Sequence, residues 1–369
     1  MLTLKDPDMP LKYKFLCLCL CSLTGVGAII IMFRISEDTT HYHNRLVRRF
    51  PQHVAEKIAQ ANLEFNSYYF AGYSNGQLYL GNTTAPLQVM AWDASLKKRN
   101  IYHIELVEKD LPFQSPRIRV DGNQFYVYEG SAPYIYRGTT REWKAKRILQ
   151  GGHYFSQLEP LDPEHLALRY VKDNGESLIG IVNLYDTADV TYGPAVLQKQ
   201  FDGIFDTDGS LHTDTDKKRL LYVYRYRNQY ILANDQAKVL YRGNTIDTIS
   251  TAQIEITEVP GQKKKTFSKP PLIVNRSSAY FNGLLFVNSL IPGRYEDDDV
   301  WKTSSIVDVY DVASRTYRSS FTVADAGGKK MRSMFVVEGK VYALIDNQLD
   351  CYMLREHLAQ SRAASASQP

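Results

Sequence analysis

The sequence predicts an all-β chain, a six-bladed β-propeller preceded by an N-terminal transmembrane helix. Three observations lead to this prediction. A tight turn followed by a short apolar strand occurs six times along the chain. Tyr, which favours half-buried pleated surfaces, is used 26 times in 369 residues. An uncharged apolar run near the N-terminus is long enough to cross a bilayer.

The apolar run extends from Phe15 to Phe33 and contains 19 residues without a charge. At ~1.5 Å per residue, a helix of this length nearly spans a hydrocarbon core of ~30 Å. A cleaved signal peptide is the main alternative, because residues 26–28 are small enough for a cleavage site. The run continues beyond them, which favours an uncleaved signal anchor over residues 15–34 and a cytoplasmic segment over residues 1–14.

The orientation of this span follows from its position rather than from its flanking charges. Basic residues lie on both sides of it, so the positive-inside rule does not determine the orientation of the span. Large domains are translocated largely regardless of charge. We therefore expect a single-pass protein of the cell membrane whose propeller lies outside the cytoplasm, as a periplasmic domain does.

Charge and cysteine content exclude several classes of function. The net charge is +4, too weak for the electrostatic footprint of a nucleic-acid-binding protein. Three of the four cysteines lie in the apolar run, which leaves Cys351 alone in the body of the chain. A disulfide framework is therefore excluded there, and we expect Cys351 to be a small buried hydrophobic residue.

Residues 35–64 form a predicted connector between the span and the propeller. Its first part is polar. Pro51 is suited to open a helix, and Val54, Ile58 and Ala61 recur at helical spacing after it. The pattern therefore predicts a short helix from Pro51 to Ala61.

The repeated unit occupies residues 65–354, and its turns are rich in residues that tolerate positive φ. The six turns are Asn75-Gly76, Asp121-Gly122, Asp162-Pro163-Glu164, Asp216-Lys217, Asn282-Gly283 and Glu338-Gly339. The strands that follow are apolar on both faces, as expected of strands between two neighbouring sheets. Their centres, at residues 79, 126, 167, 221, 286 and 342, are 41 to 65 residues apart. Four-stranded propeller blades require periods close to this.

The last unit is one strand short of a four-stranded blade. A propeller must join its first and last blades, and sharing a strand between the two ends of the chain is a common solution. The segment before Asn66 is therefore predicted to supply the missing outer strand. This closure also removes the exposed edges of an open sheet.

Two long loops and the C-terminal tail interrupt this pattern. The basic loop over residues 261–271 and the acidic loop over residues 292–299 are predicted to protrude. Their charged runs, Lys263–Lys265 and Glu296–Asp299, are expected to be solvated tips, which would still allow a partner to dock. The tail over residues 355–369 is rich in Ser, Ala and Gln and is predicted to be disordered.

The six turn-and-strand units resemble the superfamily of six-bladed, TolB-like β-propellers. The resemblance covers roughly residues 65–354 and concerns the fold. The chain has neither a WD-type signature nor the double glycine of kelch repeats nor the box of sialidase propellers. The resemblance therefore implies no activity and no catalytic residue.

Carboxylates gather in the fourth unit. Asp206, Asp208 and Asp214 lie close enough in sequence to supply oxygen ligands, which makes Ca²⁺ a candidate cofactor. The alternative is a turn-rich connection, because Asp, Gly and Ser are the usual turn residues. His212 lies between these carboxylates and is a weak candidate for a general base.

Polar residues on or next to strands form the second group of candidates. Alternation along the strand after the fourth turn places Arg225 and Arg227 on one face, where they either bind an anionic ligand or cap the rim of the sheet. Other candidates lie on strands predicted to line the central channel: Arg117, Asn275, Arg276 and Arg332.

These patterns favour a membrane-anchored, extracytoplasmic propeller that acts as a binding or scaffold module. Its partners would be the membrane, through the single span, and an envelope protein or an anionic ligand. No phosphate-binding loop, zinc motif or nucleophile elbow occurs in the sequence. The alternative is an extracytoplasmic enzyme, such as a Ca²⁺-assisted hydrolase or lyase, with its site in the central channel.

Overall fold

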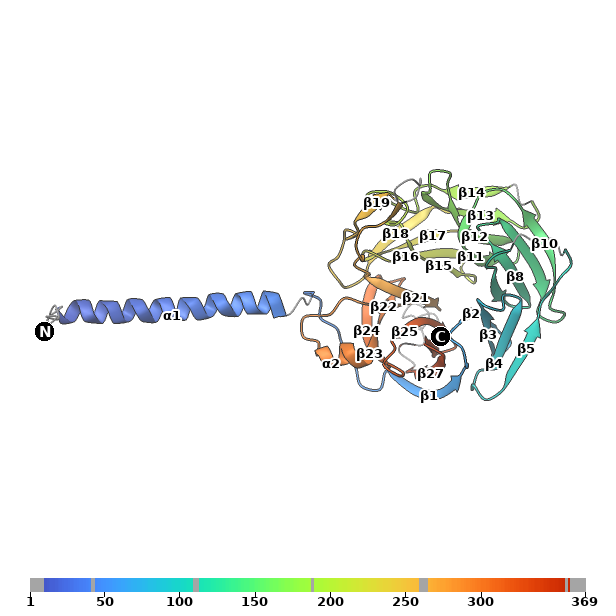
Figure 1. The fold of residues 1–369 in the computed structure, drawn as a ribbon. Helices are drawn as coiled ribbons and strands as arrows, with labels where there is room; N and C mark the ends of the chain where they lie inside the picture. Colours follow the sequence, from blue (N-terminus) through green and yellow to red (C-terminus); the bar gives the residue numbers. More distant parts are fainter. Residues whose placement is uncertain are drawn as a thin grey trace, which may run out of the picture.

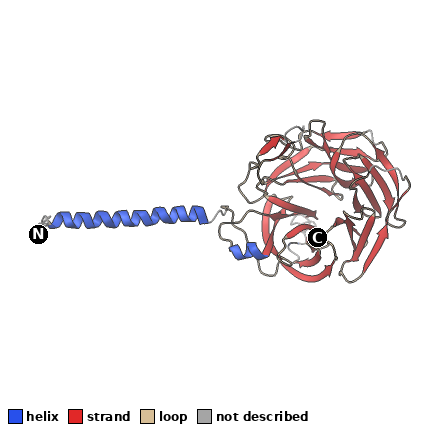
Figure 2. Ribbon diagram, in the orientation of Figure 1, coloured by secondary structure: helices blue, strands red, loops and turns tan. Residues whose placement is uncertain are grey.

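A computed structural model describes residues 10–40, 44–108, 113–186, 189–258, 265–355 and 358. Figure 1 shows sheets arranged around a common centre, with one long helix outside the ring. Apart from that helix and a short second one, the regular structure is strand (Figure 2). The architecture is that of a β-propeller.

The long helix α1 extends from Leu11 to Thr40. Its segment from Leu11 to Arg34 is long and apolar enough to cross a membrane and is not buried against the rest of the chain. An N-terminal signal sequence would have the same properties. The apolar helix predicted over residues 15–34 is thus present and continues for six more residues at its C-terminal end.

Four of the sheets have four antiparallel strands each. They consist of β1-β27-β26-β25, β11-β12-β13-β14, β15-β16-β17-β18 and β21-β22-β23-β24. Their strands are β1 (Ala55–Asn62), β11 (Phe155–Asp162), β12 (His165–Val171), β13 (Ser177–Asn183), β14 (Val190–Gly193), β15 (Gly209–Asp214), β16 (Arg219–Tyr224), β17 (Gln229–Asn234), β18 (Val239–Asn244), β21 (Asn275–Phe281), β22 (Leu284–Ser289), β23 (Ser304–Asp311), β24 (Thr316–Ala324), β25 (Met331–Val337), β26 (Lys340–Ile345) and β27 (Gln348–Leu354).

A further sheet has nine strands in the order β5-β4-β3-β2-β7-β8-β9-β10-β6. Its strands are β2 (Tyr68–Ser74), β3 (Gln77–Asn82), β4 (Gln88–Asp93), β5 (Arg99–His103), β6 (Glu105–Leu106), β7 (Arg117–Asp121), β8 (Gln124–Glu129), β9 (Tyr134–Thr139) and β10 (Lys144–Gln150). Two antiparallel groups, β5-β4-β3-β2 and β7-β8-β9-β10, meet in it where β2 and β7 pair in parallel, through Gly72 with Val120 and Tyr73 with Asp121. Strand β6 adds to β10 in parallel.

The turns of the repeated unit adopt the geometry that their residues predict. Asn75 and Gly76 both have positive φ, at 50° and 73°. Asn282 and Gly283 do the same, at 47° and 79°. Two consecutive positive φ angles are characteristic of the hairpin turn that matches the twist of its strands. The predicted tight turns are therefore confirmed at these positions.

The core lies between neighbouring sheets, as the two-sided apolar strands predict. Leu78 and Leu80 of β3 pack in one cluster with Tyr342 of β26. Tyr79, which points to the other face of β3, packs in a different cluster with Phe125 of β8. Strand β3 therefore packs on both faces, against β26 of a neighbouring sheet on one side and against β8 of the other half of its own sheet on the other.

Strand β1 closes the ring. It pairs antiparallel with β27, from Ala55 with Leu354 to Asn62 with Gln348. The prediction that the segment before Asn66 supplies the missing outer strand is confirmed. The predicted helix from Pro51 to Ala61 is wrong, because β27 offers a row of unpaired backbone groups that only an extended segment can satisfy.

The segment just before β1 is attached to the β21–β24 sheet by a buried arginine. Arg48 donates from Nε to Asp308 of β23 at 2.7 Å and from Nη1 to Glu296 at 2.7 Å. The side chain of Glu296 is only 7% exposed. The prediction that the acidic run is a solvated tip is therefore wrong for Glu296, whose charge neutralises Arg48. The next residue, Asp297, caps the short helix α2 (Asp298–Thr303).

The basic loop is folded in part. It contains a hairpin of β19 (Ile256–Glu258) and β20 (Lys265–Phe267). Phe267 packs on Phe205 with ring centroids 4.4 Å apart, which holds the hairpin against the body. Lys263 and Lys264 lie outside the described residues, while Lys265 is exposed. Most of the predicted disordered tail also lies outside them.

Candidate functional site

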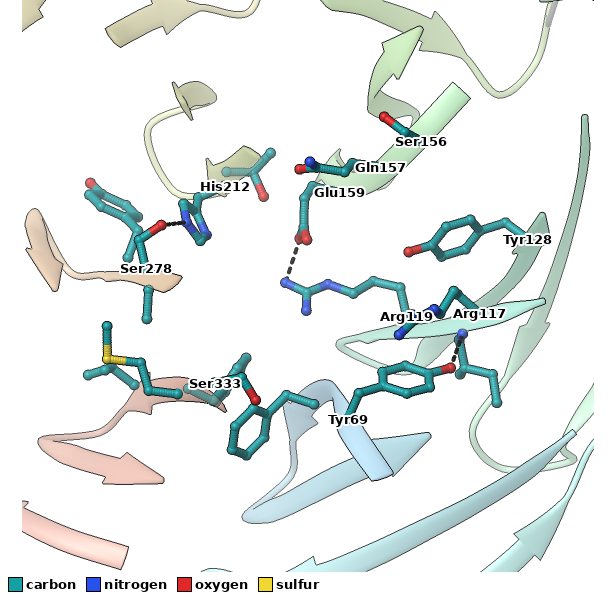
Figure 3. Close-up of a pocket in the computed structure, with 18 residues that line it drawn as sticks. Tyr69, Arg117, Arg119, Tyr128, Ser156, Gln157, Glu159, His212, Ser278 and Ser333 are labelled. Carbon is teal, nitrogen blue, oxygen red and sulfur yellow. Dashed lines mark hydrogen bonds and ion pairs between the residues drawn. The ribbon is translucent and has the colours of Figure 1, made fainter. Parts of the chain in front are cut away.

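A cavity of about 400 Å³ lies at the centre of the ring. Its lining comes from β2, β7, β11, β15, β21 and β25, which are the innermost strands of the sheets, together with Tyr128 of β8 (Figure 3). The volume falls within the range of ~300–1,000 Å³ that is typical of small-molecule sites. This cavity is the candidate functional site.

An arginine and a glutamate meet on one side of the cavity. Arg119 of β7 extends toward Glu159 of β11, and its Nη2 lies 2.5 Å from Oε2 of the carboxylate (Figure 3). The two side chains are 24% and 15% exposed. Burial raises the pKa of Glu159 to about 7, against the opposing effect of Arg119. The carboxyl group therefore changes charge near neutral pH.

A second arginine stands next to this pair. Arg117 is two residues before Arg119 on β7, so both side chains project from the same face of the strand. Its guanidinium lies 4.6 Å from the ring centroid of Tyr69, which holds it by a cation–π contact. The Tyr69 hydroxyl is fixed in turn, because it accepts a hydrogen bond from the backbone N–H of Ile118 at 2.8 Å.

A neutral histidine lies across the cavity from the arginines. Nε2 of His212 on β15 is 2.7 Å from Oγ of Ser278 on β21 (Figure 3). Burial and the charge of Arg119 lower the pKa of His212 to about 3. At neutral pH the ring is therefore uncharged and can exchange only hydrogen bonds with a ligand.

One side of the cavity is apolar. Phe70 of β2 packs against Phe335 of β25, with ring centroids 5.7 Å apart, and Met334 and Val336 line the same side. The hydroxyl of Ser333 is buried in this wall without a hydrogen-bond partner among the described residues. The cavity thus joins a charged side to an apolar side.

Only one of the predicted ligand-binding residues, Arg117, lines this cavity. Arg332 donates to the backbone carbonyl of Tyr68 at 2.5 Å, which ties β25 to the start of β2. Arg276 is partly buried on β21 and does not belong to the lining.

The other three predicted residues pack together beside β16. Arg227 is 2% exposed, lies 3.5 Å from the ring centroid of Tyr224 and donates to the Gln198 carbonyl at 2.7 Å. Asn275 donates to the Tyr224 carbonyl at 2.8 Å. Arg225 pairs with Asp208 at 3.0 Å. These contacts are all made with the protein itself.

The three predicted calcium ligands have three different sets of partners. Asp206 is fully buried and accepts backbone N–H groups, including that of Gly203 at 2.8 Å. Asp208 pairs with Arg225, and Asp214 accepts the hydroxyl of Tyr280 at 2.5 Å. Among the residues that the structure describes, no group of three His, Cys, Asp or Glu side chains is placed to hold a metal ion. Calcium binding stays a prediction.

Sequence reasoning missed Arg119 and Glu159 and gave His212 little weight. Each lies on an innermost strand, but their separation in sequence hides their proximity in the ring. The available signal was the alternation Arg117, Arg119 at the start of the second unit, which predicts two cations on one strand face.

No family model matches the chain, and no curated protein matches it either. Among solved structures, a member of the DUF4221 family from Bacteroides vulgatus has a TM-score of 0.49 at 13% identity, over 83% of this chain and 99% of that one. BamB from Moraxella catarrhalis has a TM-score of 0.42 at 10% identity, over 82% of this chain and 100% of that one.

A third similar structure is the extracellular domain of a putative one-component system from B. thetaiotaomicron. Its TM-score is 0.43 at 12% identity, over 81% of this chain and 34% of that one. Because these scores are below 0.5, none of the three likenesses carries an argument about this chain.

Proposed function

We propose that this chain is a membrane-anchored, extracytoplasmic β-propeller that acts as a binding module. The apolar segment of α1 supports the anchor, and the ring of sheets supports the module. Counting the nine-stranded sheet as two blades joined at β2 and β7 gives six blades, in keeping with the TolB-like resemblance. The proposed division is a cytoplasmic segment 1–14, an anchor 15–34, a connector 35–64 that contributes β1, a propeller 65–354 and a tail 355–369.

The ligand site that we propose is the central cavity. The observation that carries this proposal is the convergence of Arg117, Arg119, Glu159 and His212 from three innermost strands on one partly open cavity. Charged and polar groups that converge on a cavity give up part of their hydration, so their placement there is favourable when a ligand supplies the missing contacts.

A cavity-filling variant tests this proposal. Full-length protein in detergent is screened for thermal stabilisation by a chemically diverse library, because a ligand that binds only the native state raises the unfolding temperature. Ser333→Phe should abolish stabilisation by the hits, since the larger side chain occupies the cavity. Ala313→Phe, at an exposed turn, is the matched control and should leave them unchanged. Hits that stabilise Ser333→Phe as well as the native chain would place the site elsewhere.

A second candidate function is an enzyme that uses the same cavity. Glu159 favours it, because a carboxyl group with a pKa of about 7 is suited to proton transfer at neutral pH. Turnover of a screened compound that is lost in Glu159→Gln, with its binding retained, would favour the enzyme over the binding module.

A further inference from the structure

We infer that the central cavity binds a small organic carboxylate, whose charged head contacts Arg119 beside Arg117 and whose apolar body faces Phe70 and Phe335. This inference rests on the proposed function, because it names the class of ligand for the same cavity. It is carried by the distribution of charge, by the free donors of Arg119 and by the position of the apolar wall.

The charged groups that line the cavity leave it positive. Among the described residues, they are Arg117, Arg119 and Glu159, since His212 is neutral. Two cations face one carboxylate, and that carboxylate is protonated in part of the molecules at neutral pH. Asp121 continues the same face of β7 but lies outside the lining. An anionic group therefore enters a site with uncompensated positive charge.

Arg119 has donors to offer a ligand. Glu159 is its sole ion-pair or hydrogen-bond partner among the described residues, and that contact uses one terminal nitrogen. A guanidinium carries five N–H donors in a planar fork, which matches the two oxygens of a carboxylate. The remaining donors of Arg119 face the cavity (Figure 3). They are suited to a carboxylate held by two parallel hydrogen bonds.

The apolar wall selects against small inorganic anions. Phe70 and Phe335, which are only partly buried, would face water if the cavity held only a phosphate or sulfate. A ligand with a hydrocarbon body covers them and gains the free energy of apolar burial. The buried hydroxyl of Ser333 adds one polar contact on that side. An organic monocarboxylate fits the charge and the wall together.

The experiment compares matched probes on the full-length protein in detergent by calorimetry. Phenylacetate, phenylacetamide and phenethylamine share an apolar body and differ in the charge of the head, and phenylphosphonate carries a different anion. We expect phenylacetate to bind about tenfold or more tightly than the amide, the size expected of a charge-assisted hydrogen-bonded contact. Binding of the amide or the amine with equal or higher affinity would overturn the inference, as would preference for phenylphosphonate.

Two variants locate the head group. Arg119→Gln should weaken phenylacetate binding about tenfold or more, while Arg99→Gln, which removes an exposed arginine paired with Glu64, should leave it unchanged. Unchanged binding in Arg119→Gln would contradict the inference. If Arg119→Gln fails to fold, the comparison of probes on the native chain still tests whether the cavity prefers a carboxylate.

The library screen distinguishes failure of the proposed ligand class from failure of the proposed binding function. If neutral or cationic compounds bind in the cavity and carboxylates do not, the inference fails while the proposed binding function stands. If no compound of any charge stabilises the native protein, the proposed function fails and the inference fails with it.

Discussion

Glu159 is the residue whose charge near neutral pH most directly affects the cavity. Its neighbours that titrate or carry charge are Arg119 and Asp121 from β7, Tyr128 from β8 and His212 from β15. Because burial raises the pKa of Glu159 to about 7, the carboxyl group gains a proton as the pH falls from 8 to 6. Protonation ends its competition with a ligand carboxylate for Arg119.

Phenylacetate should therefore bind more tightly at pH 6 than at pH 8, by up to about tenfold, since one pKa unit corresponds to a factor of ten. The probe itself stays ionised, because simple carboxylic acids titrate near ~4. His212 stays neutral over this range, as its pKa is about 3. Calorimetry at several pH values measures the effect.

Glu159→Gln is the control for this pH dependence. The variant should bind phenylacetate at pH 8 as tightly as the native chain does at pH 6, with a flat pH profile between them. A profile that persists in Glu159→Gln would assign the pH dependence to another group, such as Asp121, whose pKa is also raised by burial.

Single residues also show the limit of sequence reasoning about the site. Arg225 and Arg227 were predicted to share a strand face, but β16 ends at Tyr224 and the chain then turns. The guanidinium of Arg227 folds back over the Tyr224 ring. Alternation predicts side-chain direction only within a strand, and the sequence does not mark the last strand residue.

Among the elements, the parallel contact between β2 and β7 depends on one glycine. Gly72 has a φ of 152°, and a Cβ at this position would lie 2.0 Å from the carbonyl oxygen of Val120. Gly72→Ala should destabilise the protein by about 2–4 kcal/mol, since it adds a steric clash to a backbone conformation that favours glycine. Denaturant unfolding of the detergent-solubilised protein measures the loss.

Gly76→Ala is the matched comparison. Gly76 also has a positive φ, at 73°, but a Cβ there meets no atom within 4 Å. Its replacement should cost only the conformational term, about 1 kcal/mol. Equal losses in the two variants would show that the clash at Val120 is relieved and that the contact between β2 and β7 tolerates a side chain.

The elements that the sequence predicts well are those whose signal is local. The positive φ angles of Asn75 and Gly76 follow from residue type alone. β1 was missed because Ala55–Asn62 has the composition of a helix and becomes a strand only through its partner β27. Pairing between the two ends of a chain is a tertiary effect, which overrides local propensity.

For the whole molecule, the segment before β1 would join the ring to the membrane in the anchored arrangement that we propose. Arg48 is held by Glu296 and Asp308, so the chain is fixed to the β21–β24 sheet only a few residues after α1 ends. A buried charge is costly to release without its partners. In that arrangement, the contacts of Arg48 fix the chain to the ring eight residues after Thr40, the last residue of α1.

The membrane topology of the whole chain can be tested with reporter fusions in a bacterial host. Alkaline phosphatase at the C-terminus, which is active only outside the cytoplasm, should be active, and β-galactosidase at the same place should be inactive, because a single N-terminal span before a large domain exports that domain. The same fusions lacking residues 1–40 should show the reverse pattern. An uncleaved anchor further requires the full-length mass in a membrane fraction that resists alkaline extraction. A shorter, extractable product with active phosphatase would instead identify a cleaved signal sequence and a released propeller.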